Sequence, residues 1–167
     1  MLLSIRKCYW LYVFLLSTLV AIVFIISNYR INYSNSEAIG IWRLKSINLP
    51  IKRGDHVALC HNLIKIDHYA SCYPFLIKTV VGIPGDEIII NNKGVKINHK
   101  LLLNSQILAR QKSIYITNTT FTLPSHYYWV YGSNNALFSF DSRYFGPVND
   151  VSIIAIACPI FVIQHRL

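Results

Sequence analysis

Acidic side chains are scarce in this sequence. Its 167 residues include only 7 Asp and Glu against 16 Lys and Arg, which gives a formal net charge of +9 and a pI of about 9.5. Such a charge suits either nucleic acid or anionic lipid. The sequence has no basic run, no zinc-finger spacing and no aromatic ribonucleoprotein motif, so we expect no nucleic-acid partner.

The sequence also has few charged residues in total and few cysteines. Charged residues make up 14% of the chain and hydrophobic residues 53%, a composition that excludes intrinsic disorder. Four cysteines in a chain of this length are too few for a small fold held together by disulfides. The length fits one domain, or a small domain with a membrane segment.

Residues 8–27 form a long stretch without a charged side chain. A helix over this stretch is about 30 Å long, which matches the hydrocarbon core of a bilayer. A cleaved signal peptide usually has a shorter apolar region and a better cleavage site. A helix buried in a soluble core usually has a polar face. We therefore expect an uncleaved transmembrane anchor over residues 8–28.

The charges on either side of this stretch predict its orientation. Arg6 and Lys7 precede it and Arg30 follows it, so the positive-inside rule favours a cytoplasmic N-terminus. We expect residues 1–7 in the cytoplasm and residues 29–167 in one domain across the membrane. Membrane lipid is then one expected partner.

Short apolar runs separated by turn residues dominate the rest of the sequence, and no segment after Arg30 has the pattern of an amphipathic helix. Residues 91–94, Asn-Asn-Lys-Gly, predict a hairpin. The last run, residues 152–163, is mostly apolar, which is typical of a strand buried on both faces. We predict a mainly β fold in which an antiparallel β domain, closed on itself, follows the anchor. The expected strands cover residues 56–60, 75–83, 87–90, 95–98, 113–117, 127–131 and 152–163.

Lys78 stands out because it lies within an apolar run, residues 75–81, that should form a core strand. A buried lysine must form an ion pair or lose its proton, and acids are scarce here. Desolvation lowers the pKa of a lysine, and a lysine that is neutral at working pH can act as a general base. From composition alone, however, a Lys78 on the solvent face of the sheet is the favoured interpretation.

A general base of this kind needs a nucleophile. The sequence has no histidine-containing triad pattern and no Gly-x-Ser-x-Gly motif, but serine with lysine is a known variant of the same chemistry. The lysine accepts the hydroxyl proton and returns it to the leaving amine. Serines are common, so chemistry alone selects none of them.

Three segments after the apolar N-terminus resemble the type I signal peptidase family of serine/lysine proteases, and more closely its conjugative-transfer branch, the TraF type. Residues 34–42, SNSEAIGIW, are similar to that branch's Ser-x-Pro-x-Gly-x-Tyr. Residues 78–86, KTVVGIPGD, resemble Lys-Arg-Val-Val-Gly-Leu-Pro-Gly-Asp. Residues 132–148 resemble Gly-x-Asn…Ser-x-Asp-Ser-Arg-x-Phe-Gly-Pro-Val. The resemblance begins near residue 34, is weakest between residues 98 and 122, and implies a signal-peptidase-like β domain.

The resemblance implies a role for each matching residue. Ser36 would be the nucleophile and Lys78 the general base. Ser34 would form the oxyanion hole with the backbone N–H of Ser36, and Ser139 would orient the lysine amine.

Further residues would support the site. Asp141 and Arg143 would form a structural pair that holds their loop against it. Gly82, Gly85 and Gly132 would permit turns and close backbone approach.

The sequence departs from the family pattern at four positions. Ala38 replaces the usual Pro, Trp42 replaces Tyr, and Thr79 replaces the common Arg after the lysine. Ser133 stands where general signal peptidases have Asp. None of these changes removes a reacting group, so we expect an active enzyme.

Cys60 and Cys72 would form a disulfide, because the TraF-type branch has a similar pair before the lysine strand. The alternative is a metal site, in which His61 and His68 complete a four-ligand set, but the spacing fits no standard zinc module. We expect no metal and no cofactor. The remaining cysteines, one in the anchor and one in the last apolar run, are expected to be thiols, the latter buried.

Taken together, the resemblance implies a serine endopeptidase in the bacterial inner membrane with its catalytic domain in the periplasm. It would cleave an exported, pilin-like precursor in conjugative transfer or type IV secretion, and some members also cyclise the pilin. One alternative is a general signal peptidase that removes secretory signal peptides. Another is a non-catalytic, membrane-tethered β scaffold, which would not need both Ser36 and Lys78. For the enzyme, Ser36 Oγ and Lys78 Nζ should lie within hydrogen-bond reach, or somewhat further apart without substrate.

Overall fold

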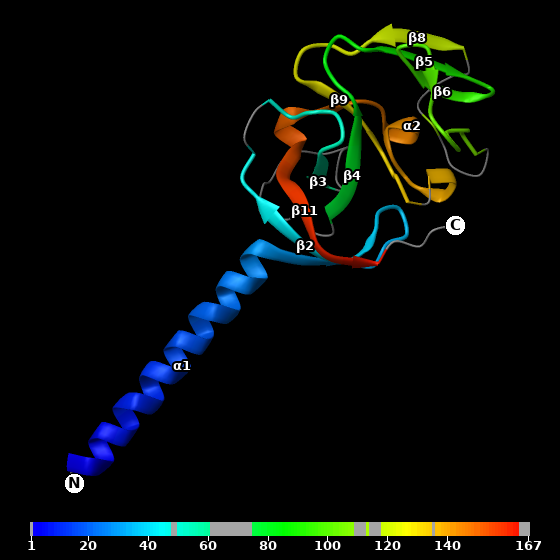
Figure 1. The fold of residues 1–167 in the computed structure, drawn as a ribbon. Coiled ribbons are helices and arrows are strands. Elements are labelled where there is room, and N and C mark those ends of the chain that lie inside the picture. Colours follow the sequence, from blue (N-terminus) through cyan, green and yellow to red (C-terminus); the bar gives the residue numbers. More distant parts are fainter. Residues whose placement is uncertain are drawn as a thin grey trace.

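A computed structural model describes residues 2–47, 50–60, 75–108, 113, 118–134 and 136–163. One long helix, α1 (Leu2–Asn28), projects from a β domain (Figure 1). The strands are β1 (Tyr29–Asn32), β2 (Ile39–Lys45), β3 (His56–Cys60), β4 (Phe75–Gly82), β5 (Glu87–Asn91), β6 (Gly94–Ile97), β7 (Lys100–Leu101), β8 (Thr119–Thr122), β9 (Tyr127–Tyr131), β10 (Val148–Asn149) and β11 (Ile153–Ile163). The described residues also form the short helices η2 (Ala136–Phe138), α2 (Ser142–Phe145) and η3 (Asp150–Ser152).

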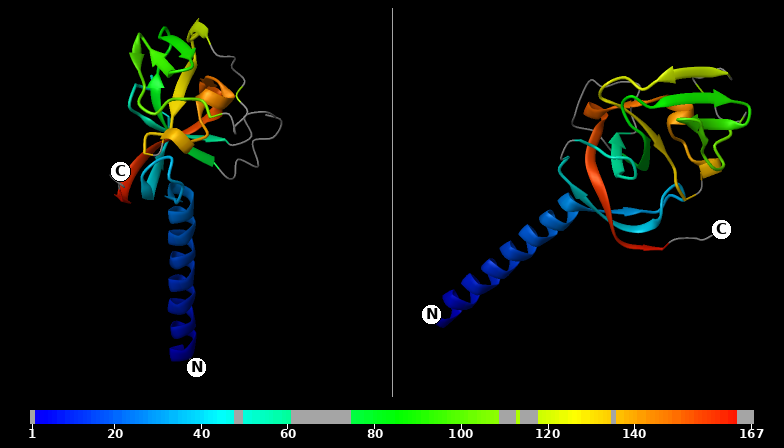
Figure 2. Two further views of the ribbon diagram at one scale, coloured as in Figure 1. Left: turned by 90° about the vertical axis from the view of Figure 1, so that its right-hand side faces the viewer. Right: turned by 45° about the horizontal axis from the view of Figure 1, so that its top comes forward.

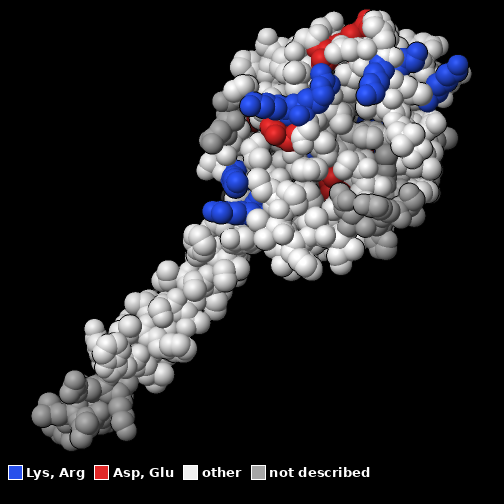
Figure 3. Space-filling model, viewed as in Figure 1, with Lys and Arg blue, Asp and Glu red and all other residues white. Residues whose placement is uncertain are grey.

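Helix α1 contains the stretch that the sequence predicts as an anchor. Its segment Cys8–Asn28 is long and apolar enough to cross a membrane, with a mean hydropathy of 2.5, and none of it is buried against the rest of the chain. Figure 3 shows Lys, Arg, Asp and Glu side chains on the β domain and none along this segment. Strand β1 begins at Tyr29, directly after the helix, so no linker separates α1 from the β domain.

The described strands divide into two antiparallel sheets, a division that the predicted antiparallel β domain did not specify. The larger sheet has the order β1-β2-β11-β3-β4-β9-β10, and the smaller sheet has the order β7-β6-β5-β8. The smaller sheet lies at the end of the domain that is remote from α1 (Figures 1 and 2). The predicted fold class, mainly β and antiparallel after an apolar helix, is confirmed.

Several strands form where the turn residues predict them. Strands β3 and β9 have the predicted bounds. Strands β5 and β6 form the predicted hairpin, in which Asn91 pairs with Gly94. The expected strand at 113–117 lies largely outside the described residues.

Strand β11 differs from the prediction because it buries only one face. Ile153, Ala155 and Ala157 are buried, Ile154 between them is exposed, and residues 159–163 are mostly exposed. An antiparallel sheet tolerates this arrangement because one of its faces can remain in contact with solvent. Cys158, predicted to be a buried thiol, is a free thiol of intermediate exposure, and Cys8 is also free.

Each sheet has its own apolar core. In the larger sheet, Val57, Val80 and Val130 on β3, β4 and β9 are fully buried in one cluster. In the smaller sheet the corresponding cluster includes Ile88 and Ile90 of β5. Because β4 and β9 lie inside the larger sheet, side chains at their centres are shielded from water, which matters for the lysine on β4.

Candidate active site

Lys78 lies in the middle of β4 and is 1% exposed. Side chains alternate along a strand, so Lys78 shares a face with Leu76 and with the fully buried Val80. The solvent-facing position that composition favours is therefore wrong. Burial lowers the pKa of Lys78 from 10.5 to about 8, although the negative charges of Asp141 and Glu37 act against this. With this pKa, about a tenth of Lys78 is neutral at pH 7 and about half at pH 8.

Among the described residues, the amine of Lys78 has one hydroxyl partner. Its Nζ donates a hydrogen bond to Ser139 Oγ at 2.7 Å, and Ser139 is 2% exposed. Gly132 makes this approach possible, because a Cβ at that position would lie 2.1 Å from Ser139 Oγ. The structure thus brings the predicted base and the predicted lysine-orienting residue into direct contact.

Ser34 and Ser36 lie in the turn between β1 and β2. Their hydroxyl oxygens are hydrogen-bonded to each other at 2.8 Å. Asn32, the last residue of β1, holds this turn: its side-chain amide donates to the carbonyls of Ser34, Glu37 and Ala38, and its Oδ1 accepts from the N–H of Ser34. The turn is therefore fixed to the strand that follows the anchor.

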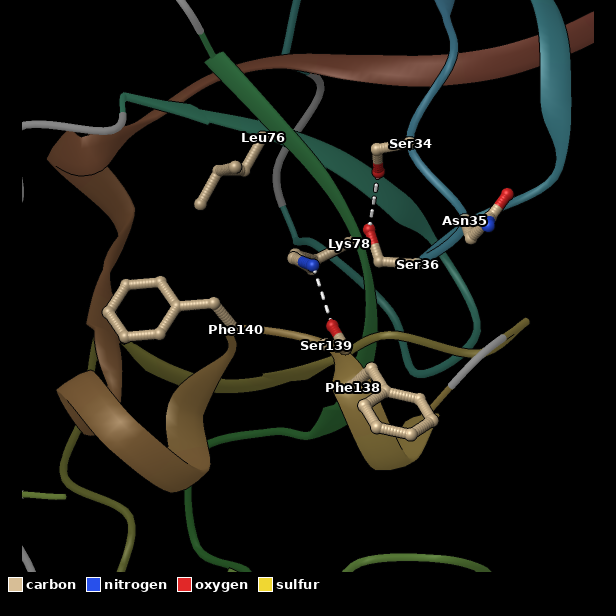
Figure 4. Close-up of a pocket in the computed structure, with 8 residues that line it drawn as sticks. All are labelled: Ser34, Asn35, Ser36, Leu76, Lys78, Phe138, Ser139 and Phe140. Atoms are coloured by element: carbon tan, nitrogen blue, oxygen red, sulfur yellow. Dashed lines mark hydrogen bonds between the residues drawn. The ribbon is translucent and has the colours of Figure 1, made fainter. Parts of the chain in front are cut away.

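A pocket of about 240 Å³ brings these segments together. In Figure 4 the polar ends of Ser36, Lys78 and Ser139 point into one space. Within the described residues no hydrogen bond joins Ser36 Oγ to Lys78 Nζ, because each is held by its own serine neighbour. The pocket also has an apolar side, formed by Leu76, Phe138 and Phe140, which the sequence analysis did not single out. The lining residues are Ser34, Asn35, Ser36, Leu76, Lys78, Phe138, Ser139 and Phe140.

Asp141 and Arg143 form a fully buried ion pair, with Arg143 Nε 2.8 Å from Asp141 Oδ1 and Nη2 2.9 Å from Oδ2. The pair also reaches the site: Arg143 Nη2 donates to the Ser139 carbonyl at 3.0 Å, and Asp141 Oδ2 accepts from the Gly132 N–H at 3.1 Å. Burial alone would lower the pKa of Arg143, but its hydrogen bonds to Asp141 and the charge of that residue raise it. The pair therefore links the loop that contains Gly132 to the loop that contains Ser139.

Glu37 is a buried residue of the site that the sequence analysis did not single out. It is 1% exposed, and its carboxylate accepts hydrogen bonds from Thr79 Oγ1 at 2.9 Å, from the Ser133 N–H at 3.1 Å and from the Ser133 hydroxyl. Thr79 and Ser133 lie 42 and 96 positions away, so no local pattern predicts these contacts. The only available signal was a scarce acid directly after Ser36.

Part of the predicted cysteine chemistry falls outside the described residues. Cys60, at the end of β3, is disulfide-bonded. Cys72, His61 and His68 are not among the described residues, so the Cys60–Cys72 pairing and the alternative metal set stay predictions. In the ranges that the structure describes, no group of three or more His, Cys, Asp or Glu could hold a metal ion.

Comparison with known proteins assigns the family. The profile of the family described as "Signal peptidase, peptidase S26" matches residues 4–162. The chain belongs to this family. Peptidase S26 proteins are serine peptidases, so the buried lysine and the serine turn lie in a chain of the class that the sequence motifs predict.

Several relatives carry conjugation names. Conjugal transfer protein TraF of Agrobacterium tumefaciens (strain 15955) is 28% identical over 151 residues, which cover 82% of this chain and 84% of the relative. Plasmid transfer protein TraF of Escherichia coli is 29% identical over 147 residues, covering 78% and 81%. Signal peptidase I V of Bacillus subtilis (strain 168) is 31% identical over 93 residues, covering 48% and 54%. These relatives confirm the predicted resemblance.

A solved structure is also similar to this peptidase S26 chain. It is a crystal structure of a signal peptidase I from Enterococcus faecalis, with a TM-score of 0.41 and 24% sequence identity. The similarity covers 66% of this chain and 98% of that chain.

Proposed function

We propose that this protein is a membrane-anchored serine endopeptidase that cleaves an exported, pilin-like precursor in conjugative transfer or type IV secretion. One observation carries the proposal: the Ser36 hydroxyl and the amine of the buried Lys78 line the same pocket. The printed names of the TraF relatives support the process, and the family supports the reaction class.

In the proposed reaction Lys78 acts as the general base. A neutral amine has two N–H bonds and one lone pair. Its hydrogen bond to Ser139 leaves the lone pair available to accept the proton of Ser36. Ser36 Oγ then forms a bond to the carbonyl carbon of the substrate. When the C–N bond breaks, Lys78 returns the proton to the leaving amine, and an acyl group remains on Ser36.

The first step requires Ser36 to exchange its hydrogen-bond partner. Its hydroxyl contacts Ser34, and a shift toward Lys78 would free the Ser34 hydroxyl. Ser34 and the backbone N–H of Ser36 are the proposed donors to the oxyanion. Hydrogen bonds in active sites commonly tighten when substrate binds. A single donor of this kind contributes about 10²–10³-fold to kcat in a comparable protease.

The acyl group can be transferred in two ways. Attack by water releases a shortened precursor, whereas attack by the amine of the same chain would give a cyclic product. Both reactions use the same Ser36 and Lys78 chemistry, and the apolar side chains of Leu76, Phe138 and Phe140 are available to contact the substrate. Cleavage is the proposed reaction, and cyclisation is a variant of it.

We propose a single-pass arrangement in the bacterial inner membrane. Residues 1–7 would lie in the cytoplasm, 8–28 would span the lipid, and 29–167 would form the periplasmic peptidase domain. Arg6 and Lys7 support this orientation through the positive-inside rule. Because β1 directly follows α1, the pocket would stay close to the membrane surface, where an exported precursor emerges.

Processing in cells tests this function. The probe is an epitope-tagged pilin precursor that has an N-terminal signal segment and alanine at the first and third positions before the cut. It is co-expressed with the wild type, with Ser36→Ala or with Lys78→Ala, and membrane levels of each variant are checked by immunoblot. We expect the wild type to shorten the precursor and both variants to leave it intact.

Two other outcomes would favour the alternatives. Processing by all three chains would contradict the Ser36 and Lys78 assignment and favour the scaffold. Equal cleavage of an unrelated secretory precursor would favour a general signal peptidase, which the Bacillus subtilis relative makes the relevant comparison. Mass spectrometry of the product separates a linear product from a cyclic one by the mass of one water.

A further inference from the structure

Glu37 has a central place in the site, yet the proposed reaction does not use it. Its carboxylate is 1% exposed and accepts hydrogen bonds from two segments that are remote in sequence. Thr79 of β4 provides one donor, and Ser133, in the loop after β9, provides two. A buried carboxylate is costly unless it is paired or hydrogen-bonded. These donors compensate that cost and fix where the carboxylate lies.

Two of these positions adjoin the proposed reacting groups. Glu37 directly follows Ser36, and Thr79 directly follows Lys78. The 2.9 Å hydrogen bond from Thr79 Oγ1 to Glu37 Oε1 therefore connects the nucleophile's turn to the strand of the base. No direct hydrogen bond joins Ser36 to Lys78 in the described structure, so this link helps to set their separation.

The contact with Ser133 fixes a third segment. Ser133 follows Gly132, the residue against which Ser139 packs. The next residue, Asn134, donates its N–H to the carbonyl of Ser36 at 3.1 Å. The loop that supports Ser139 is thus attached to the serine turn both through Glu37 and through the Ser36 backbone.

His56 of β3 orients one of the donors. Its Nδ1 lies 3.1 Å from Thr79 Oγ1 and 3.7 Å from Glu37 Oε2. The single hydroxyl hydrogen of Thr79 is donated to Glu37, so the hydrogen in the His56–Thr79 contact must come from Nδ1. His56 therefore acts as a donor that holds the Thr79 hydroxyl toward the carboxylate.

The residue types at positions 79 and 133 fit this arrangement. Thr79 and Ser133 both provide hydroxyl groups that donate to Glu37. An Asp at position 133 would place a second carboxylate against Glu37, where like charges repel. The presence of Glu37 therefore accounts for a small donor at this position.

We propose that Glu37 is a positioning residue of the Ser36–Lys78 site, whose carboxylate fixes the spacing between the segments that carry the nucleophile, the base and Ser139. The inference rests on the proposed peptidase function. It adds a residue that acts through its neighbours and does not touch the substrate.

The charge of Glu37 provides a signature that a purely structural role lacks. Burial is the largest influence on the pKa of Lys78 and lowers it, Glu37 and Asp141 raise it, and Arg143 lowers it. His56 faces Glu37 from the neighbouring strand. Removing the charge of Glu37 should therefore lower the Lys78 pKa below about 8, and the acid limb of the pH–rate profile should move to lower pH.

The test uses the full chain in detergent micelles with the same tagged precursor, and kcat and KM are measured from about pH 6 to 10. Glu37→Gln keeps the shape of the side chain and removes its charge. We expect kcat to fall about 10- to 100-fold, KM to stay within about twofold, and the acid midpoint to move down. Glu37→Asp keeps the charge and shortens the reach, so kcat should fall while the midpoint stays near that of wild type. The matched control is Glu87→Gln, a partly exposed carboxylate of β5, which should change neither quantity.

Each outcome decides the proposal. A wild-type kcat in Glu37→Gln overturns it wherever the midpoint lies, and so does a lower kcat with an unmoved midpoint. If Glu37→Gln does not fold, Thr79→Val and Ser133→Ala decide, because each must lower kcat; wild-type kcat in either variant overturns the proposal. Ser36→Ala and Lys78→Ala are measured alongside. If they stop processing, the peptidase function stands whatever Glu37 does, and if they do not, both proposals fall.

Discussion

The larger sheet buries charged and polar side chains in addition to its apolar core, whereas the smaller sheet buries mainly apolar ones. Around the larger sheet the nearly inaccessible residues include Glu37, Lys78, Ser139, Asp141 and Arg143. The core cluster of the smaller sheet contains Ile88, Ile90, Val95, Ile97, Leu123 and, from β9 of the larger sheet, Trp129. A buried charge costs free energy even when it is well paired, whereas a buried aliphatic side chain contributes about 1.5–3 kcal/mol. The comparison indicates that the larger sheet combines the candidate chemistry with an apolar core, while the smaller sheet contributes mainly stability.

Replacing the buried base should produce the largest effect and separate activity from stability. We expect Lys78→Met to abolish processing and to stabilise the protein below pH 8. The lowered Lys78 pKa means that the charged form is disfavoured in the folded state. The shift corresponds to a cost of roughly 3 kcal/mol, so a gain of about 1–3 kcal/mol is expected after the loss of the Ser139 contact.

The pH dependence of this gain follows from its sign. The cost is fully present below the folded-state pKa of about 8 and disappears as pH rises toward 10.5, the ordinary value. Denaturant unfolding of wild type and Lys78→Met at pH 7 and near 10.5 measures it. A less stable variant at pH 7 would contradict the division between the sheets.

Removing an aliphatic side chain from the smaller sheet should have the opposite effect. Ile90 is fully buried, so Ile90→Ala should lower the free energy of unfolding by about 2–5 kcal/mol. Processing per folded molecule should stay at the wild-type level because Ile90 does not line the pocket. Unfolding curves and single-turnover rates, normalised to the folded fraction, measure both quantities. A loss of kcat in the folded protein would show that the sheets are coupled.

Two glycines that each pack against a serine hydroxyl make a matched pair. A Cβ on Gly132 would lie 2.1 Å from Ser139 Oγ, and a Cβ on Gly94 would lie 2.3 Å from Ser105 Oγ. We expect Gly132→Ala to reduce kcat about 100-fold, since a displaced Ser139 no longer orients the base.

Gly94→Ala is the control for that change. Its φ of +126° adds backbone strain, so it should reduce stability by at least as much as Gly132→Ala. The Ser105 hydroxyl is hydrogen-bonded to the backbone of Val95 and Leu102 and does not line the pocket. We therefore expect kcat per folded molecule to be unchanged. Equal losses of kcat in the two variants would argue against a local role for Gly132.

The last prediction needs no substitution and concerns how kcat/KM of the wild-type protein depends on pH through the proposed base, Lys78. The base must be neutral, so kcat/KM should rise about tenfold per pH unit below an acid midpoint near 8 and level off above it. Stopped assays of precursor cleavage measure the profile, with Ile90→Ala as a control whose midpoint should not move. A midpoint near 10.5 would indicate a lysine in contact with water.

Local signals predicted much of the fold. The β5–β6 hairpin follows from Asn-Asn-Lys-Gly between two apolar runs, and β3 follows from an apolar run after a turn. Strand β8 was missed because its Thr-rich sequence, Thr119–Thr122, has no apolar period, and its partner β5 lies far away in the chain. The one-sided burial of β11 was missed because apolar composition does not reveal whether a layer covers each face.

The site shows a similar limit. Family motifs brought Ser36, Lys78 and Ser139 together in the prediction, while composition alone placed Lys78 in solvent. Glu37 was missed because its role follows from hydrogen bonds with the hydroxyls of Thr79 and Ser133, which are remote in sequence and approach Glu37 only in the folded chain. Pairwise contacts between distant residues leave no periodic pattern, so they are found only when the fold is known.

The position of β11 determines when the site can form. It lies between β2, which follows the serine turn, and β3, which pairs with the lysine strand β4. In the larger sheet Ile39 of β2 pairs with Ile163, so β2, whose other edge pairs with β1, joins the rest of the sheet only after the last described strand is synthesised. Pairing across such a sequence separation is slow. A nascent chain that lacks β11 thus carries Ser36 and Lys78 on segments that no continuous sheet yet joins, so the candidate site is assembled only late in folding.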